Sequence, residues 1–263
     1  MTLRRVVLPE TLDGLAEDDP SAMRSRRDLR RIHRVMGTRS IVAQALHKLM
    51  ASRVDKRPLR MLELGAGDGS LMLGVARAAG GHWPSVELTL LDRQDLVSRA
   101  TLAGYADAGW SATSEVCDVF DWAAGGRIPR NSQIPPHEAA IGHWDVIVCN
   151  LFLHHFEGGQ LLALLAAIES RADAFFACEP RRGGLALAAS HLVGAIGANA
   201  VTREDAVLSV HAGFRDAELT QAWPVSPASR AGWTFDEYPA GLFSHCFCAL
   251  RREPAETQGE APP

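Results

Sequence analysis

Two adjacent histidines at the end of an apolar run are the first candidates for chemistry. The run "VIVCN" ends at Asn150, and His154 and His155 follow after three more apolar residues. An imidazole titrates near neutral pH, so such a residue can accept a proton, bind a metal ion or fill a loop. We expect no metal site, because the side chains of sequence neighbours diverge and no third ligand has a suggestive spacing. The surrounding sequence has to decide between the other two roles.

A glycine-rich turn is the second candidate. "MLELGAGDGS" places Gly65, Gly67 and Gly69 directly after an apolar run, and glycines let the backbone approach a ligand closely. A dinucleotide site prefers G-x-G-x-x-G, whereas here the third glycine comes one residue early. Asp68 within the turn and Glu63 before it would repel a pyrophosphate. The turn therefore favours a ligand that has a positive centre and no phosphate.

Short apolar runs alternate with helix-like stretches through the middle of the chain. The runs cover residues 59–65, 86–92, 113–119, 144–150 and 174–180. This alternation predicts a parallel sheet that is covered by helices on both faces. Two further strands are expected around residues 217–223 and 243–251. Ligands of such sheets bind at the carboxyl ends of the strands, where the glycine turn belongs.

Composition and charge exclude several classes of partner. The 263 residues are 47% hydrophobic and 22% charged, which fits one large globular domain. A net charge of -4 gives no general attraction to nucleic acid or to an anionic membrane. Most of the five cysteines lie in apolar runs, which is typical of buried, reduced thiols. There is no signal peptide and no run of about 20 apolar residues, so we expect a soluble, cytoplasmic protein.

Four segments between Arg60 and Pro180 together resemble a known family. "LELGAGDGS", "TLLDR", "VCDVF" and "WDVIVCNLFLHHF" look like the ordered motifs of class I (Rossmann-like) S-adenosylmethionine-dependent methyltransferases of the small-molecule type. The resemblance implies S-adenosylmethionine (SAM) as cofactor. It also implies a doubly wound α/β fold, with a mostly parallel seven-stranded sheet, helices on both faces and an antiparallel C-terminal strand. SAM has an ammonium group, a sulfonium and no phosphate, which agrees with the acidic turn.

The resemblance also implies roles for individual residues. Asp92 stands where the family has an acid that accepts both ribose hydroxyls, and Asp118 stands near the adenine amino group. The expected cofactor-binding residues are Glu63, Gly65, Ala66, Gly67, Asp92, Arg93, Asp118, Val119, Asn150 and Leu151. The expected catalytic residues are His154 and His155, which would face the transferable methyl group. Whether either one is a general base stays open.

The same resemblance implies how the chain is divided into an N-terminal cover, a methyltransferase domain and a tail. Residues 1–54 are expected to form an N-terminal arm and a helical cover, with 1–20 loosely held and two helices separated at Gly37. The methyltransferase domain would cover residues 55–252, in which 185–211 would cover the acceptor site. Residues 125–143 form a long predicted loop, and residues 253–263 a disordered tail.

The function that this implies is transfer of a methyl group from SAM to a small organic acceptor. A hydroxyl of a phenolic or polyketide-like metabolite is the first choice of acceptor. The alternatives are C-methylation of a similar metabolite and a non-catalytic SAM-binding protein. The "N-P-P-Y" motif of nucleobase methyltransferases is absent after Asn150, which favours a small-molecule substrate. The acceptor's identity and the oligomeric state stay open.

Overall fold

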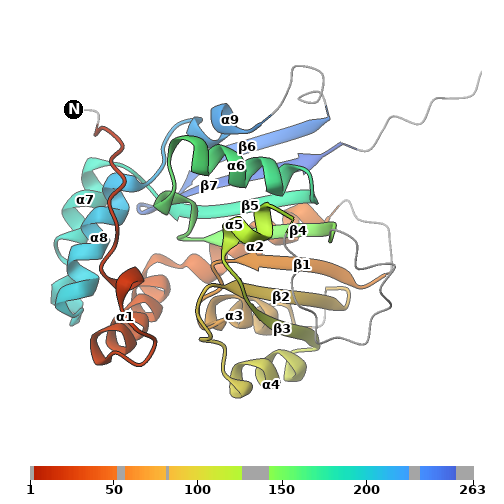
Figure 1. The fold of residues 1–263 in the computed structure, drawn as a ribbon, viewed down its shortest axis with the longest axis horizontal. Coiled ribbons are helices and arrows are strands. Elements are labelled where there is room, and N and C mark those ends of the chain that lie inside the picture. The colour runs from red at the N-terminus through yellow and green to blue at the C-terminus, as the bar shows by residue number, and fades with distance from the viewer. Residues whose placement is uncertain (1–2, 52–56, 81–82, 126–141, 225–231, 253–263) are drawn as a thin grey trace, which may run out of the picture.

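The computed structural model describes residues 3–51, 57–80, 83–125, 142–224 and 232–252, which form a seven-stranded sheet with helices around it (Figure 1). The strands are β1 (Leu59–Leu64), β2 (Val86–Asp92), β3 (Trp110–Val116), β4 (Trp144–Asn150), β5 (Ala172–Pro180), β6 (Trp233–Ala240) and β7 (Ser244–Arg251). Their order is β3-β2-β1-β4-β5-β7-β6. β1 to β5 are parallel, whereas β7 is antiparallel to both β5 and β6. The predicted fold class is confirmed.

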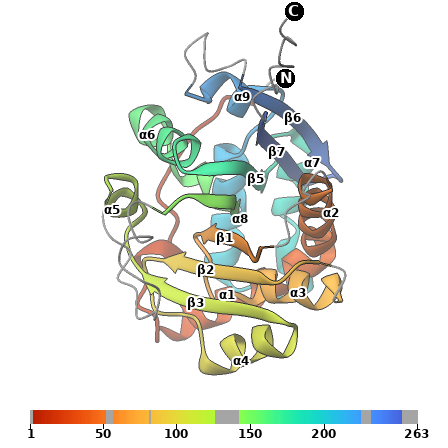
Figure 2. The same ribbon diagram turned by 90° about the vertical axis from the view of Figure 1, so that its right-hand side faces the viewer.

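Each face of the sheet is buried under its own set of helices. One face carries α2 (Thr38–Met50), α3 (Ser70–Ala79) and α4 (Arg99–Asp107), and the other carries α5 (Val119–Ala123), α6 (Gly158–Glu169) and α9 (Glu218–Ala222). Figure 2 shows α2 and α3 on one side of the sheet and α5 and α6 on the other. Phe175 and Phe176 of β5 are both fully buried, one in each core. Burial on both faces explains why the central strands read as unbroken apolar runs.

The two predicted N-terminal helices are present. α1 (Pro20–Met36) begins with proline at its first position, where the missing N–H costs nothing, and Asp19 caps it. Gly37 ends α1 with a φ of 69°, and α2 starts at the next residue. α1 lies with α7 (Gly184–Ser190), η3 (Val193–Ile196) and α8 (Ala200–Ala212) beyond one end of the sheet (Figure 1).

Two predicted strands are placed differently in the structure. Residues 217–223 were expected to be a strand, but they contain α9, and the sixth strand is Trp233–Ala240. Leu219, Ala222 and Trp223 have helical spacing, and the Glu237 side chain accepts hydrogen bonds from the backbone N–H groups of Leu219 and Thr220. The expected strand at 113–119 lies three residues earlier, at Trp110–Val116, and Asp118 caps α5 instead.

The expectation of a loosely held N-terminal arm is wrong for residues 3–19. Arg5 donates hydrogen bonds to the backbone oxygens of Ala212 and Phe156. The short η1 helix (Leu12–Gly14) follows, and Asp205 of α8 accepts hydrogen bonds from the backbone N–H groups of Thr11 and Leu12. These contacts are non-local, which is why composition alone suggested a loose segment.

All five cysteines are free thiols, as expected. Within the described ranges, no helix combines the length and the apolar character that crossing a membrane requires. The predicted tail at 253–263 lies outside the described residues. So does the predicted loop at 125–143, apart from its two ends.

Candidate active site

A cavity of about 390 Å³ opens where the carboxyl ends of β1, β2 and β4 meet α1 and the N-terminal arm. It lies at the point where the strand order turns from β1 to β4, the usual ligand site of such sheets. The structure brings all twelve predicted residues to its wall: Glu63, Gly65, Ala66, Gly67, Asp92, Arg93, Asp118, Val119, Asn150, Leu151, His154 and His155. The predicted residues, which lie up to 92 positions apart in the chain (Glu63 to His155), therefore meet at one site.

The glycine turn has the conformation that its composition predicted. Gly65, Gly67 and Gly69 have φ values of 68°, 56° and 70°, which residues with a side chain rarely adopt. A Cβ on Gly65 would overlap the Phe152 ring. The Gly65 and Ala66 N–H groups donate to the Leu91 oxygen at 2.9 and 3.1 Å, which fixes the turn against β2.

Two buried oxygen atoms at the cavity have no partner among the described residues. They are Oε2 of Glu63 and Oδ1 of Asn150, whose residues are 2% and 8% exposed. Burial, together with the charges of Asp92 and Asp68, raises the pKa of Glu63 well above its usual value. A buried acceptor without a partner is costly, so both atoms suit a ligand that brings N–H donors, preferably cationic ones.

Asp92 and Asp118 use only part of their capacity in the protein. The Gly67 N–H donates to Asp92 Oδ2 at 2.8 Å and the Gln94 N–H to Oδ1 at 3.0 Å. Asp118 Oδ1 accepts from the Phe120 N–H at 2.7 Å, which caps α5. A carboxylate oxygen has two acceptor sites, so both side chains can still bind ligand donors.

The first helix closes the cavity over the glycine turn. Arg30 of α1 forms an ion pair with Asp68 at 2.5 Å, and Arg26 donates to the Gln94 side chain at 3.1 Å. His33 is partly buried near Asp68, and burial lowers its pKa to about 4. Both arginines line the cavity: Arg30 is paired with a carboxylate, whereas Arg26 donates to two uncharged oxygens, those of the Gln94 side chain and the Glu17 backbone.

A buried carboxylate organises the loop that carries the two histidines. Leu151 has a φ of 50°, and η2 (Leu153–His155) follows it. The fully buried Glu179 of β5 accepts hydrogen bonds from the Phe152, Leu153 and His154 N–H groups, the shortest at 2.9 Å. Burial opposes its ionisation, but His154 and these N–H groups still lower the pKa of Glu179. From the sequence, Glu179 was a candidate for touching the acceptor or capping a helix; the structure makes it the anchor of this loop.

His154 is enclosed between two carboxylates. Its Nδ1 lies 2.8 Å from Glu179 Oε2, its Nε2 lies 3.3 Å from Glu10 Oε1, and its side chain is 2% exposed. Burial lowers its pKa, but the hydrogen bonds and charges of Glu10 and Glu179 outweigh burial and raise the pKa to about 9. His154 is therefore an imidazolium at neutral pH, with both ring nitrogens paired.

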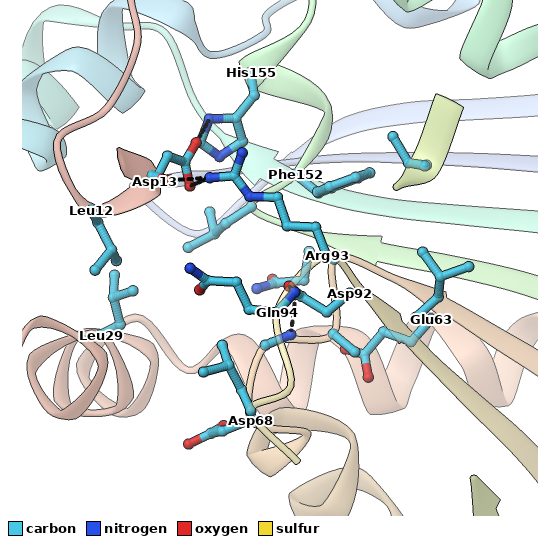
Figure 3. Close-up of a pocket in the computed structure, with 18 of the residues that line it drawn as sticks. Leu12, Asp13, Leu29, Glu63, Asp68, Asp92, Arg93, Gln94, Phe152 and His155 are labelled. Atoms are coloured by element: carbon cyan, nitrogen blue, oxygen red, sulfur yellow. Dashed lines mark hydrogen bonds and ion pairs between the residues drawn. The ribbon is translucent and has the colours of Figure 1, made fainter. Parts of the chain in front are cut away.

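His155 has the opposite character. Its side chain is 21% exposed, and Nδ1 lies 3.4 Å from Asp13 Oδ2. Burial and the positive charge of His154 lower the pKa of His155, with Glu10, Asp13 and Glu179 opposing them. Figure 3 shows the Asp13 carboxylate beside His155 and Arg93. A neutral imidazole has one ring nitrogen without a proton, and that nitrogen can accept one.

The N-terminal arm supplies two site residues that sequence reasoning missed. Glu10 contacts His154 and accepts a hydrogen bond from Ser209 of α8, and Asp13 contacts His155 and Arg93. Both acids line the cavity. No local pattern could reveal them, because Glu10 lies 144 residues before its histidine partner.

The sequence argument against a metal ion assumed that the two adjacent histidine side chains diverge, and this assumption is wrong. The rings of His154 and His155 do not diverge: their centroids are 4.2 Å apart and their planes differ by 34°. Glu10 adds a third potential ligand atom within 4.8 Å of the other two. His154 is protonated at neutral pH and would have to lose that proton before it could bind a metal ion. The absence of a metal stays a prediction.

The pairing of His154 predicts a pH-dependent stability. The folded pKa of about 9 lies above the ordinary 6.5, so the proton on His154 stabilises the folded state. This contribution, roughly 3 kcal/mol, is full below about pH 6.5, declines above it and is lost above about pH 9. Urea unfolding of the wild type should show this decline between those pH values, and His154→Gln should lack it. Equal pH dependence of the two proteins would contradict the pairing.

Comparisons with known proteins support the fold. No protein-family model matches the sequence, and no curated protein matches it either. Among solved structures, the chain resembles the plantazolicin methyltransferase BpumL in complex with S-adenosylhomocysteine (SAH). The TM-score is 0.55 and the identity is 13%, and the alignment covers 89% of this chain and 92% of that one. The plantazolicin methyltransferase BamL, with SAH and a triazolic desmethylPZN analog, gives 0.56 and 13%, covering 92% and 94%. The chain therefore has the Rossmann-like fold of these methyltransferases.

Proposed function

We propose that this chain is a SAM-dependent methyltransferase that methylates a hydroxyl group of a small organic acceptor. The observation that carries the proposal is the pair of unpartnered acceptor atoms, Glu63 Oε2 and Asn150 Oδ1, at the cavity. They suit the ammonium group of SAM, because a charged donor compensates buried acceptors best. The fold shared with methyltransferases that hold S-adenosylhomocysteine (SAH) supports the same ligand.

The other predicted residues fit the remaining parts of SAM. Asp92 would accept the ribose hydroxyls, and Asp118 and Val119 would hold the adenine. The glycine turn, with Ala66, would lie against the methionine portion, and Arg93 and Leu151 would complete the wall. The Gly67 N–H of the same turn already donates to the Asp92 carboxylate, which argues against a pyrophosphate there and so against a nicotinamide dinucleotide.

His155 is the proposed proton acceptor. Bound SAM supplies a methyl group on a sulfonium; its transfer to an acceptor oxygen leaves neutral SAH and releases the hydroxyl proton. His155, neutral and facing the cavity, can take that proton, with Asp13 stabilising the resulting imidazolium. His154, also predicted to be catalytic, is disfavoured as a base because both its nitrogens are paired; we propose that it holds the loop and the arm together.

We also keep the predicted division of the chain as part of this proposal. The described part of residues 1–54 would cover the cofactor, supported by the contact between Arg30 and Asp68. Residues 185–211, which contain most of α7, η3 and most of α8, would cover the acceptor.

Isothermal titration of the purified protein tests the proposal. SAH should bind, whereas NAD and ATP should produce no heat of binding, because the Asp92 carboxylate already accepts from the Gly67 N–H of the turn. Binding of NAD without any response to SAH would contradict the cofactor assignment. Release of SAH from SAM in the presence of a phenol library would then separate an enzyme from a non-catalytic binding protein.

A further inference from the structure

A second cavity, of about 250 Å³, lies beside the first among α1, α7, η3 and α8. Its wall is largely apolar and includes Leu29, Ile32 and Met36 of α1, Ala189 of α7, Val193 of η3 and Val210 of α8. An apolar cavity of roughly 150 Å³ is enough for benzene, so this chamber can take a larger group.

The few polar side chains on the wall are mostly engaged elsewhere. Asp205 accepts two N–H groups of the arm, and Ser209 donates to Glu10. Ser25 donates to the Asn199 side chain and Ser190 to the Leu187 oxygen. The Thr202 hydroxyl has no partner among the described residues. The wall carries two carboxylates, Glu10 and Asp205, and no cationic side chain among the described residues, so an anionic ligand would lose its hydration without compensation.

The chamber adjoins the place where methyl transfer would occur. Glu10, Leu12, Leu29, Leu151 and Ser209 line both cavities. Leu151 follows Asn150 directly, and Glu10 contacts His154, so the shared wall lies next to the two histidines. A molecule with its reactive end at His155 can therefore extend into the apolar chamber.

The outer end of the chamber has an apolar rim. Val35, Leu192 and Ile196 line the chamber, yet they are 69%, 67% and 45% exposed. They come from α1, from η3 and from the residue that precedes η3, and the chamber brings them together. Exposed apolar side chains around a cavity are typical of a binding site.

We propose that this chamber holds the apolar body of the methyl acceptor. The acceptor is then an uncharged, elongated molecule, such as a phenol with a long alkyl or polycyclic substituent, whose hydroxyl reaches His155. The transfer itself rests on the proposed function, but occupancy of the chamber can be measured without it. A nucleotide or a short anionic acid is excluded as the occupant, because no described side chain on the chamber wall is cationic.

A series of para-alkylphenols tests this inference by titration calorimetry, with and without saturating SAH. Affinity should rise by about fourfold per added methylene from para-cresol through para-butylphenol to para-octylphenol, until the chamber is full. Ala189→Phe and Ala206→Phe should fill the chamber and weaken para-octylphenol at least about tenfold, with para-cresol and SAH binding unchanged. Ala188→Phe is the matched control, since Ala188 is exposed on the same helix and does not line the chamber.

Each outcome decides the inference. Affinity that does not depend on alkyl length in the wild type overturns it, whether or not the variants fold. A length dependence that the two filling variants leave intact also overturns it, because the chain then binds elsewhere. Dimerisation that Leu192→Ser abolishes would identify the rim as a self-association surface instead. An affinity that rises with alkyl length, in a protein that does not bind SAH, would support the chamber and contradict the proposed function. The two proposals therefore fail separately.

Discussion

Replacing His155 with alanine is expected to lower kcat by about 10²–10⁴-fold, the usual contribution of a positioned base, and to leave SAH affinity unchanged. His155 faces the cavity through a side chain that is 21% exposed, with Asp13 at its Nδ1. The measurement is SAH release from SAM with the phenol that gives the highest turnover, together with titration of SAH.

The pH profile separates proton transfer from simple positioning. The pKa of His155 lies below its ordinary 6.5, so wild-type kcat should fall only as the pH drops below that value and the imidazole gains its proton. His155→Gln keeps a polar side chain of similar size without a titrating ring, and should lose both the rate and this acidic limb. His143→Ala is the control, because His143 pairs with Asp173 beside the amino end of β4, away from the cavity. Near-normal kcat in His155→Ala would show that His155 only fills the loop.

Asp92→Ala is expected to weaken SAH binding by about 1–3 kcal/mol, or roughly 5- to 150-fold. Two effects combine: the charged acceptor for the ribose is lost, and so are the hydrogen bonds from the Gly67 and Gln94 N–H groups that shape the site. Titration calorimetry measures the change, and the melting temperature reports any loss of stability.

Asp95→Ala is the matched control for Asp92→Ala. Asp95 is a nearby acid that does not line the cavity, so its loss should leave SAH affinity within error. If Asp92→Ala binds SAH as the wild type does, Asp92 serves only the turn. The cofactor would then be held in another way.

The strands and the glycine turn could be predicted because their signals are local. Burial on both faces makes β1, β4 and β5 continuous apolar runs, and positive φ angles require the glycines of the turn. The sixth strand was missed because "WTFDEYPA" carries acids and a proline at positions that the structure leaves partly exposed. The helical spacing of Leu219 and Trp223 was the signal that could have corrected the neighbouring segment.

The histidine pair shows where local reasoning ends. From the sequence, His154 and His155 were equivalent, since they are adjacent and share one loop. The structure separates them, because Glu179 and Glu10 hydrogen-bond to His154 and raise its pKa, while the pKa of His155 is lowered and its side chain lines the cavity. A pKa depends on which charges are close in space, and those carboxylates lie 25 and 144 residues away along the chain.

The sequence by itself determined the sheet class, the glycine turn and the set of side chains at the strand ends, because each depends on neighbouring residues and on strand order. Only the tertiary structure decided which histidine keeps a free nitrogen, that the arm belongs to the site, and that an apolar chamber adjoins it. Those features arise where α1, α8 and residues 3–19 converge on the sheet. Such contacts join segments through packing and burial, and they leave no period or motif in the chain.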